Sequence, residues 1–131
     1  MTKTYYWLTL KEVIALHQEL IKDYGGHDGI LDEGALDSTI FRPQQLAYYQ
    51  PDSPLCDLAA AYGYGLVKNH CFVDGNKRIA FVVMAVFLLI NGYELTATEV
   101  EAVDIMINLA QGNITQSQLA LWLTDNSVVT T

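Results

Sequence analysis

The sequence predicts an all-α helical bundle in which other helices surround one buried central helix. Residues 79–90 form an unbroken run of twelve apolar residues, too short to cross a bilayer, which takes roughly 20, but suited to the centre of a bundle. Helix-capping sequences recur along the chain, and no stretch shows the sustained alternation of apolar and polar residues typical of a half-buried strand. Residues 1–131 are therefore expected to form a single domain.

Composition and charge exclude several classes of protein. With 131 residues, 51% of them hydrophobic and 17% charged, the chain is long enough to bury one core without disulfides or metals. A net charge of −8 argues against general nucleic-acid binding, which rests on Lys and Arg contacts with phosphates, although a local cationic pocket is compatible with it. Two cysteines provide neither a disulfide framework nor a zinc-binding spacing. The first residues lack the apolar segment of a signal peptide, so we expect a soluble, cytoplasmic protein.

The first helix is expected to begin at a capping box formed by Thr9 and Glu12, in which each side chain accepts a hydrogen bond from the other residue's backbone N–H. Apolar residues at positions 13, 14, 16, 20 and 21 give this helix one buried face. Gly25 and Gly26 are expected to end it, because glycine readily adopts the left-handed conformation that follows many helices. Residues 25–31 then form a loop.

The second helix is expected to be shorter, over about 32–41, because Pro43 disfavours a helical conformation at Arg42. Residues 43–54 include all three prolines of the chain. We interpret this segment as an ordered loop or a short hairpin.

The third helix is expected to begin with Ser53 as its cap and Pro54 at its first position, and to reach about Asn69. Gly63 and Gly65 lower its helical propensity by roughly 1 kcal/mol each. Glycines inside an otherwise favourable helix indicate that neighbouring helices approach closely there.

The remaining helices are expected over about 75–91, 96–111 and 115–124. The first of these is the central helix, which Asn91 and Gly92 end. A capping box formed by Thr96 and Glu99 opens the next helix. A further box, Thr115 with its partner three residues later, opens the last.

Chemically active residues are concentrated directly before the central helix. The nine residues from His70 to Arg78 are His-Cys-Phe-Val-Asp-Gly-Asn-Lys-Arg. The first N–H groups of a helix have no intrahelical partner, and the helix dipole makes that end positive. Gly75, Asn76 and Lys77 lie where those groups occur, so their amides are placed to cradle phosphate oxygens.

The charged residues of this motif suggest how a polyphosphate would be bound and used. Arg78 can grip phosphate through two parallel hydrogen bonds, with Lys77 adding charge. Asp74 beside bound phosphates is most simply a Mg²⁺ ligand. His70 can act as the base that deprotonates an attacking hydroxyl, and Phe72 is expected to point into the core and pin the loop. Cations at the start of a helix are unfavourable, which a bound polyanion would offset.

The motif from His70 to Arg78, H-x-F-x-D-G-N-K-R, resembles the signature of the Fic/Doc family, and in particular its death-on-curing (Doc) toxin branch. The resemblance extends to Tyr24-Gly25-Gly26 and to Asn91-Gly92, so it covers nearly the whole chain. It implies an all-α Fic fold and an activity that uses a Mg²⁺-bound nucleotide to modify a hydroxyl on a target protein.

The resemblance also assigns roles to the motif. It implies that His70 is the general base and Asp74 the magnesium ligand. Residues 75–77 would form the phosphate nest, with Asn76 and Arg78 holding phosphate oxygens.

Two positions depart from the general Fic pattern. Lys77 stands where AMP-transferring members carry a second glycine, and Phe81 stands where they carry another arginine. Both departures resemble Doc toxins, which are protein kinases that transfer the γ-phosphoryl group of ATP, and there Lys77 and Arg78 would stabilise charge on the moving group. The implied target is a threonine of elongation factor Tu, whose modification arrests translation. AMP transfer to a protein hydroxyl and a noncatalytic Fic-fold binding module are the alternatives.

The resemblance further implies an inhibitory partner. Many Fic proteins restrain themselves with a helix bearing Ser/Thr-x-x-x-Glu-Gly/Asn. Here the one Glu-Gly pair is Glu33-Gly34, Gly29 occupies the Ser/Thr position, and no Glu-Asn pair exists. Restraint is therefore expected from a separate antitoxin protein, a segment of which folds onto the toxin.

His27 and Asp28 raise a different possibility, because adjacent His and Asp residues are metal ligands in HD phosphohydrolases. Those enzymes need further ligands on neighbouring helices, whereas this pair lies in a Gly-flanked loop with only His17 to assist. We therefore expect no metal site of that kind.

Two other features have ordinary structural interpretations. Cys71 beside His70 is expected to be a buried packing thiol rather than half of a thiol–imidazole dyad. Tyr48 and Tyr49 are interpreted as core residues or, alternatively, as part of a flap that positions the target segment.

Overall fold

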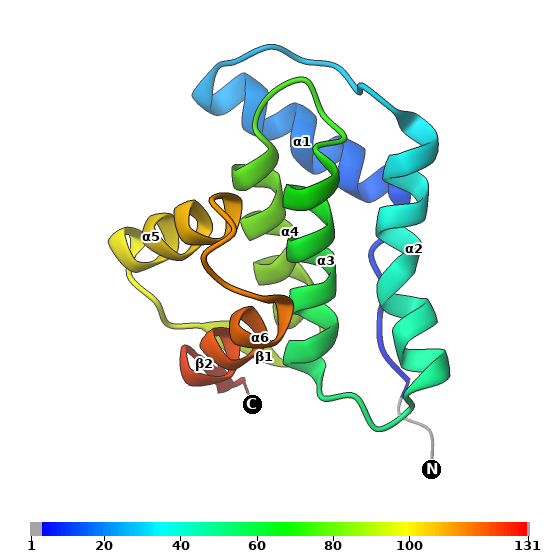
Figure 1. The fold of residues 1–131 in the computed structure, drawn as a ribbon, viewed down its shortest axis with the longest axis vertical. Coiled ribbons are helices and arrows are strands. Elements are labelled where there is room, and N and C mark those ends of the chain that lie inside the picture. The colour runs from blue at the N-terminus through cyan, green and yellow to red at the C-terminus, as the bar shows by residue number, and fades with distance from the viewer. Residues whose placement is uncertain (1–3, 131) are drawn as a thin grey trace.

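The apolar run lies inside a bundle of helices, in a computed structural model that describes residues 4–130 (Figure 1). The elements are α1 (Leu10–Tyr24), α2 (Glu33–Tyr49), α3 (Leu55–Asn69), α4 (Asn76–Ile90), β1 (Tyr93–Leu95), α5 (Glu99–Ala110), α6 (Gln116–Asp125) and β2 (Ser127–Val129). All six helices contribute to one cluster of buried side chains, which confirms the expected all-α architecture for the described part of the chain. Within residues 4–130, no helix has the length and apolar character needed to span a membrane.

Two neighbouring helices, α3 and α4, share the centre of the bundle. Helix α3 packs against α2, α4 and α6, whereas α4 packs against α3, α1, α5 and β1 (Figure 1). Helix α4 is the expected central helix, yet its last two residues, Leu89 and Ile90, are 56% and 41% exposed. Helix α3 is more evenly buried, because small residues such as those at 59–61 let other helices approach it on several sides.

The two glycines inside α3 mark these close approaches, as the sequence predicted. A Cβ at Gly63 would collide with the Met84 side chain of α4. A Cβ at Gly65 would lie 2.9 Å from Thr39 Cγ2 of α2. Both glycines are therefore required by helix packing and not by a turn.

The expected helix ends are largely confirmed. Capping boxes are present at Thr9 and Thr115, where the hydroxyl accepts a backbone N–H three residues later and the side chain there accepts the threonine N–H. Helix α1 ends at Tyr24, and Gly25 follows with a φ of 84°. Pro54 caps α3 instead of occupying its first turn, so this helix starts one residue later than expected.

Helix α2 is longer than expected. The sequence predicted an end before Pro43 and an irregular segment over 43–54, but α2 continues to Tyr49 with Pro43 buried inside it. A proline there cannot donate to the Thr39 carbonyl and disfavours the helix by about 3 kcal/mol. Packing of the following turn against the core, through Leu46 and its neighbours, offsets this loss.

The start of α5 also differs from the prediction. Its capping box is formed by Thr98 and Glu101 and not by Thr96 and Glu99. The Thr96 N–H donates to the Asn126 carbonyl at 2.7 Å, which holds Thr96 in an extended connection before the helix. Both threonines have an acid three residues later, so the sequence pattern alone did not distinguish them.

Two short strands were not expected. β1 and β2 pair antiparallel, with Tyr93 opposite Val129 and Leu95 opposite Ser127. Each strand has three residues, too few to show an alternating pattern. The strands join the chain after α4 to the chain after α6 and do not alter the helical character of the fold.

The segment before α1 is extended and lies along the bundle as the dark-blue chain of Figure 1. The Tyr6 backbone exchanges two hydrogen bonds with the Asn91 side chain, at 2.9 and 3.0 Å. The fully buried Tyr62 hydroxyl accepts the Leu8 N–H at 3.1 Å. Residues far apart in the sequence thus hold this segment in place.

Burial raises the pKa of Tyr62 from 10.0 to about 12. The hydrogen bond with Leu8 lowers this pKa but offsets only part of the increase. The native state therefore holds this proton more tightly than the unfolded chain does. We expect the protein to lose up to about 2–3 kcal/mol of stability as the pH rises from 10 to 12, measured by urea unfolding. Tyr62→Phe should remove this part of the alkaline loss, because phenylalanine does not ionise.

Tyr6→Phe is the matched control, because it removes a phenol that is 73% exposed instead of a buried one, and it should leave the alkaline loss of stability unchanged. An equal alkaline loss in Tyr62→Phe and the unmodified protein would contradict the assignment.

Candidate active site

The motif from His70 to Arg78 connects α3 to α4 at one end of the bundle (Figure 1). The loop between α1 and α2 lies against it. The Leu31 N–H donates to the Cys71 carbonyl at 2.8 Å, and the Val73 N–H donates to the Gly29 carbonyl at 3.0 Å. These bonds run antiparallel and fix the middle of the motif.

His70 stands at the end of α3. It adopts the left-handed conformation (φ 46°, ψ 56°), and no other described residue except glycine has a positive φ. The preceding Asn69 donates to Thr39 Oγ1 at 2.7 Å, which ties the end of α3 to α2. His70 itself is exposed. An exposed imidazole on an anchored helix end suits proton exchange with a bound molecule.

Asp74 is exposed and held by backbone amides. Its Oδ2 accepts the His27 N–H at 3.3 Å, and its Oδ1 accepts the Gly75 N–H at 2.8 Å. These bonds, first from His27 and then from Gly75, hold the pKa of the Asp74 carboxyl below its usual range, so it is ionised at neutral pH. Gly26 allows this approach, because a Cβ there would lie 2.7 Å from Oδ2.

The donor set around Asp74 fits one kind of metal ion. In the described part of the chain, no three His, Cys, Asp or Glu side chains are grouped so that they could hold a metal. Mg²⁺ commonly takes one or two carboxylates and completes its shell with water and phosphate oxygens. A single ionised carboxylate therefore fits magnesium that arrives with a phosphate ligand.

The start of α4 concentrates positive charge. Gly75 caps it in the left-handed conformation (φ 76°) without a capping side chain, and the first turn has no acid. Because Gly75 donates its own N–H to Asp74, the outward-facing amides begin at residue 76 and not at residue 75 as expected. Lys77 and Arg78 are exposed, and Arg78 Cζ lies 4.6 Å from the ring centre of Tyr24. This arrangement attracts an anion with several oxygens.

The Asn76 side chain does not face the position where phosphate was expected. It is 7% exposed, its Oδ1 accepts the Phe72 N–H at 3.1 Å, and its Nδ2 donates to the Phe72 carbonyl at 2.9 Å. The Asn76 side chain thus links the start of α4 to the backbone of the preceding loop. The family resemblance implied a phosphate ligand, but the buried backbone of Phe72 uses both polar atoms of this side chain. The expectation that the Asn76 side chain holds phosphate oxygens is corrected accordingly.

Phe72 is fully buried and pins the loop, as expected. Its ring stacks on His17 of α1, with centroids 3.8 Å apart. The sequence did not indicate that His17 would contact this loop or that the Tyr24 ring would contact Arg78. The available signal was an isolated polar residue on the apolar face of α1.

Two alternatives considered from the sequence lack support. His17 Nδ1 lies 3.9 Å from Asp28 Oδ1, but no third ligand completes a metal cluster with this pair among the described residues. Cys71 is buried, and burial raises the pKa of its thiol, so it is a packing thiol as expected.

The interpretation of the tyrosine pair as core residues is wrong. Tyr48 and Tyr49 are 80% and 78% exposed, so they are not core residues. They lie at the end of α2, beside the start of α3, whereas the motif follows the end of α3 (Figure 1). They therefore lie toward the opposite end of α3 from the motif.

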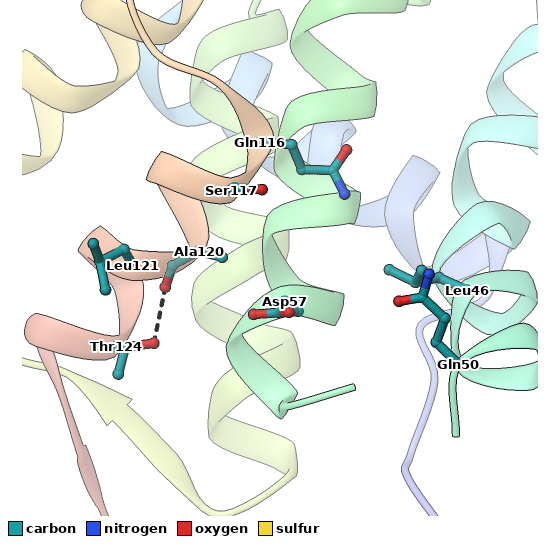
Figure 2. A pocket seen from close by; sticks show the side chains of 8 residues that line it. All are labelled: Leu46, Gln50, Asp57, Gln116, Ser117, Ala120, Leu121 and Thr124. Atoms are coloured by element: carbon teal, nitrogen blue, oxygen red, sulfur yellow. Dashed lines mark hydrogen bonds between the residues drawn. The ribbon is translucent and has the colours of Figure 1, made fainter. Parts of the chain in front are cut away.

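A groove of about 360 Å³ lies between α2, α3 and α6 (Figure 2). Its lining includes Gln50, Asp57 and Gln116, which Figure 2 shows around the opening. None of its lining residues belongs to the motif. The groove is therefore separate from the candidate active site.

Comparison with known proteins identifies relatives. A family model described as the Fic/DOC family matches residues 7–88. The chain is 34% identical over 110 residues to "Protein kinase doc" of Escherichia phage P1, and this alignment covers 84% of this chain and 86% of that protein. It is 44% identical over 75 residues to "Toxin Doc" of Mycolicibacterium smegmatis, and this alignment covers 56% of this chain and 58% of that protein.

The left-handed conformation of His70 leads to a test of stability. We expect His70→Gly to be more stable than His70→Ala by about 1 kcal/mol, because glycine has no Cβ to clash in this conformation. Urea unfolding of the two variants measures the difference. Equal stabilities would contradict the left-handed conformation at this position.

The corrected orientation of Asn76 leads to a second test. Asn76→Ala leaves the Phe72 N–H and carbonyl without partners, so we expect a loss of roughly 1–3 kcal/mol in the free energy of unfolding. Gln18→Ala, an exposed position on α1, is the control and should change stability by less than about 0.5 kcal/mol. A variant that is fully stable and only weaker in phosphate binding would return Asn76 to the role expected from sequence.

Proposed function

This chain belongs to the Fic/DOC family, in its Doc toxin branch, and on that premise we propose that it transfers the γ-phosphoryl group of Mg-ATP to a serine or threonine hydroxyl of a translation factor. One observation carries the proposal. An exposed histidine and an ionised carboxylate flank an uncapped helix start whose first turn bears two cations and no acid. Within this proposal, residues 1–131 act as one Fic/Doc domain.

Each exposed group of the motif has a role in this transfer. His70 accepts the proton of the target hydroxyl, whose oxygen forms a bond to the γ-phosphorus. The bond from that phosphorus to the bridging oxygen breaks, and ADP leaves with the electron pair. Lys77, Arg78 and the amides of residues 76–78 bind the phosphate oxygens and stabilise the charge that develops on them. Asp74 would hold Mg²⁺, which would supply further charge neutralisation.

The region beyond the first turn of α4 favours phosphoryl transfer over AMP transfer. Phe81, one turn after Arg78, packs against the hydrophobic core and contributes no charge. The positive groups are therefore confined to the helix start. Such a site holds one short stretch of phosphate at high charge density, as transfer of a terminal phosphoryl group requires.

We propose elongation factor Tu as the target, on the basis of family resemblance. The relative from phage P1 bears the name of a protein kinase, which supports the reaction class. A translation factor as substrate places the activity in the cytoplasm.

We also propose that a separate antitoxin restrains the protein. The relative from Mycolicibacterium smegmatis bears the name of a toxin. Within the described residues, the Arg78 guanidinium contacts the Tyr24 ring and forms no ion pair with a carboxylate of its own chain. An acidic side chain on the antitoxin would then compete with phosphate for Arg78.

The decisive experiment incubates the purified protein with elongation factor Tu and Mg-ATP and measures the intact mass of the factor. We expect the mass of one phosphate group to be added. Addition of a whole nucleotide would instead establish AMP transfer. An unmodified factor, with no other translation factor modified, would reject the enzyme and leave a binding module.

Variants link the activity to the site. His70→Ala should lower the rate by roughly 100-fold or more and abolish growth arrest, since the general base is lost. Lys77→Ala should lower it by roughly 100-fold. Lys11→Ala, which removes another exposed lysine, at the start of α1, should not. Full toxicity of His70→Ala would reject His70 as the base.

A further inference from the structure

We propose that His17 is a positioning residue for the candidate active site. From α1 it fixes the peptide unit between Asp74 and Gly75, and through that unit it orients the Asp74 carboxylate. The inference rests on the proposed function, because it assigns a support for the carboxylate that the proposed reaction uses.

One buried imidazole contacts three positions of the motif. The His17 ring is 2% exposed and stacks on Phe72, at an interplanar angle of 14°. Its Nε2 lies 2.8 Å from the Asp74 carbonyl oxygen. A Cβ at Gly75 would lie 3.6 Å from the same nitrogen, so the ring also covers the glycine. Packing alone would not require a polar ring here.

The hydrogen bond requires a proton on one particular nitrogen of the imidazole. A backbone carbonyl oxygen only accepts, so His17 Nε2 carries a proton and donates it to Asp74. The other ring nitrogen, Nδ1, lies 3.9 Å from Asp28 Oδ1, on the loop whose His27 amide also holds the Asp74 carboxylate. The imidazole therefore lies beneath the loop that carries the site.

Planarity of the peptide bond carries the effect to the carboxylate. The Asp74 carbonyl and the Gly75 N–H belong to one trans peptide unit, in which the two groups point in opposite directions. His17 holds the carbonyl toward α1, so the Gly75 N–H points away from α1 and donates to Asp74 Oδ1 at 2.8 Å. If the peptide unit rotated, the carboxylate would lose this donor and α4 would lose its fixed start.

Two substitutions separate the hydrogen bond from the stacking. His17→Phe keeps an aromatic ring against Phe72 but removes the donor. His17→Gln keeps an N–H near the position of Nε2 but removes the ring. We expect His17→Phe to lower kcat/KM for Mg-ATP and to raise the Mg²⁺ concentration for half-maximal rate. Each change should be about tenfold or more, as is common when a group that orients a metal ligand is lost. His17→Gln should recover most of this loss, and the exposed control Gln18→Ala should change neither value.

Measurements without nucleotide or metal test the same geometry. Amide hydrogen exchange at Gly75 should be faster in His17→Phe than in the unmodified protein, and close to the unmodified value in His17→Gln. Imidazole ¹⁵N shifts of the unmodified protein should show a proton on His17 Nε2. These readouts are independent of activity, and the ¹⁵N shifts also require no variant.

The outcomes distinguish the two proposals. A bare Nε2 with the proton on Nδ1, or unchanged Gly75 exchange together with unchanged Mg-ATP dependence in His17→Phe, would overturn the role of His17. Failure of the unmodified protein to transfer phosphate would reject the proposed function, and the exchange and ¹⁵N data would still decide whether His17 fixes the loop. If His17→Phe does not fold, the ¹⁵N shifts and the His17→Gln variant decide the question.

Discussion

The close approach of α2 and α4 to α3 is the constraint on which the rest of the structure depends. Gly63 meets Met84 of α4 and Gly65 meets Thr39 of α2, so a side chain at either glycine would force the helices apart. The same approach brings Thr39 within hydrogen-bonding distance of Asn69, which fixes the end of α3. The position of the motif is thus a consequence of helix packing along α3, because the motif joins the end of that helix to the start of α4.

Buried side chains in and beside the motif fix the backbone that carries its exposed side chains. Phe72, Asn76 and His17 are buried, and each has a defined partner that leaves it few alternative conformations. The exposed side chains of the same motif include those of the histidine, the aspartate and the two cations, at positions 70, 74, 77 and 78. The proposed binding of a metal and a polyphosphate needs both properties, since the ligands must be accessible and also preorganised. The strained backbone at the end of α3 has the same explanation, because it presents an imidazole where a glycine would be more stable.

Local sequence patterns predicted a helix end correctly wherever the interaction that determines it lies within one helical turn. The capping boxes at Thr9 and Thr115 and the end of α1 before Gly25 are of this kind, and all are confirmed. The patterns gave wrong predictions where contacts with residues distant in the sequence determine the local conformation. Helix α2 continues through Pro43 because the next turn packs on the core, and Thr96 is not a cap because Asn126 binds its backbone.

The sequence by itself determined which chemical groups the site contains, because it places a histidine, a carboxylate and two cations around the start of an apolar helix, and helix geometry gives that start its positive amides. Only the tertiary structure decided which polar groups face outward. In the folded chain the Asn76 side chain binds the Phe72 backbone, and His17 binds the Asp74 carbonyl, 57 residues away in the chain. Periodicity predicts which face of a helix is buried, but what lies opposite that face depends on how the helices cross, and hydrogen bonds follow from that contact.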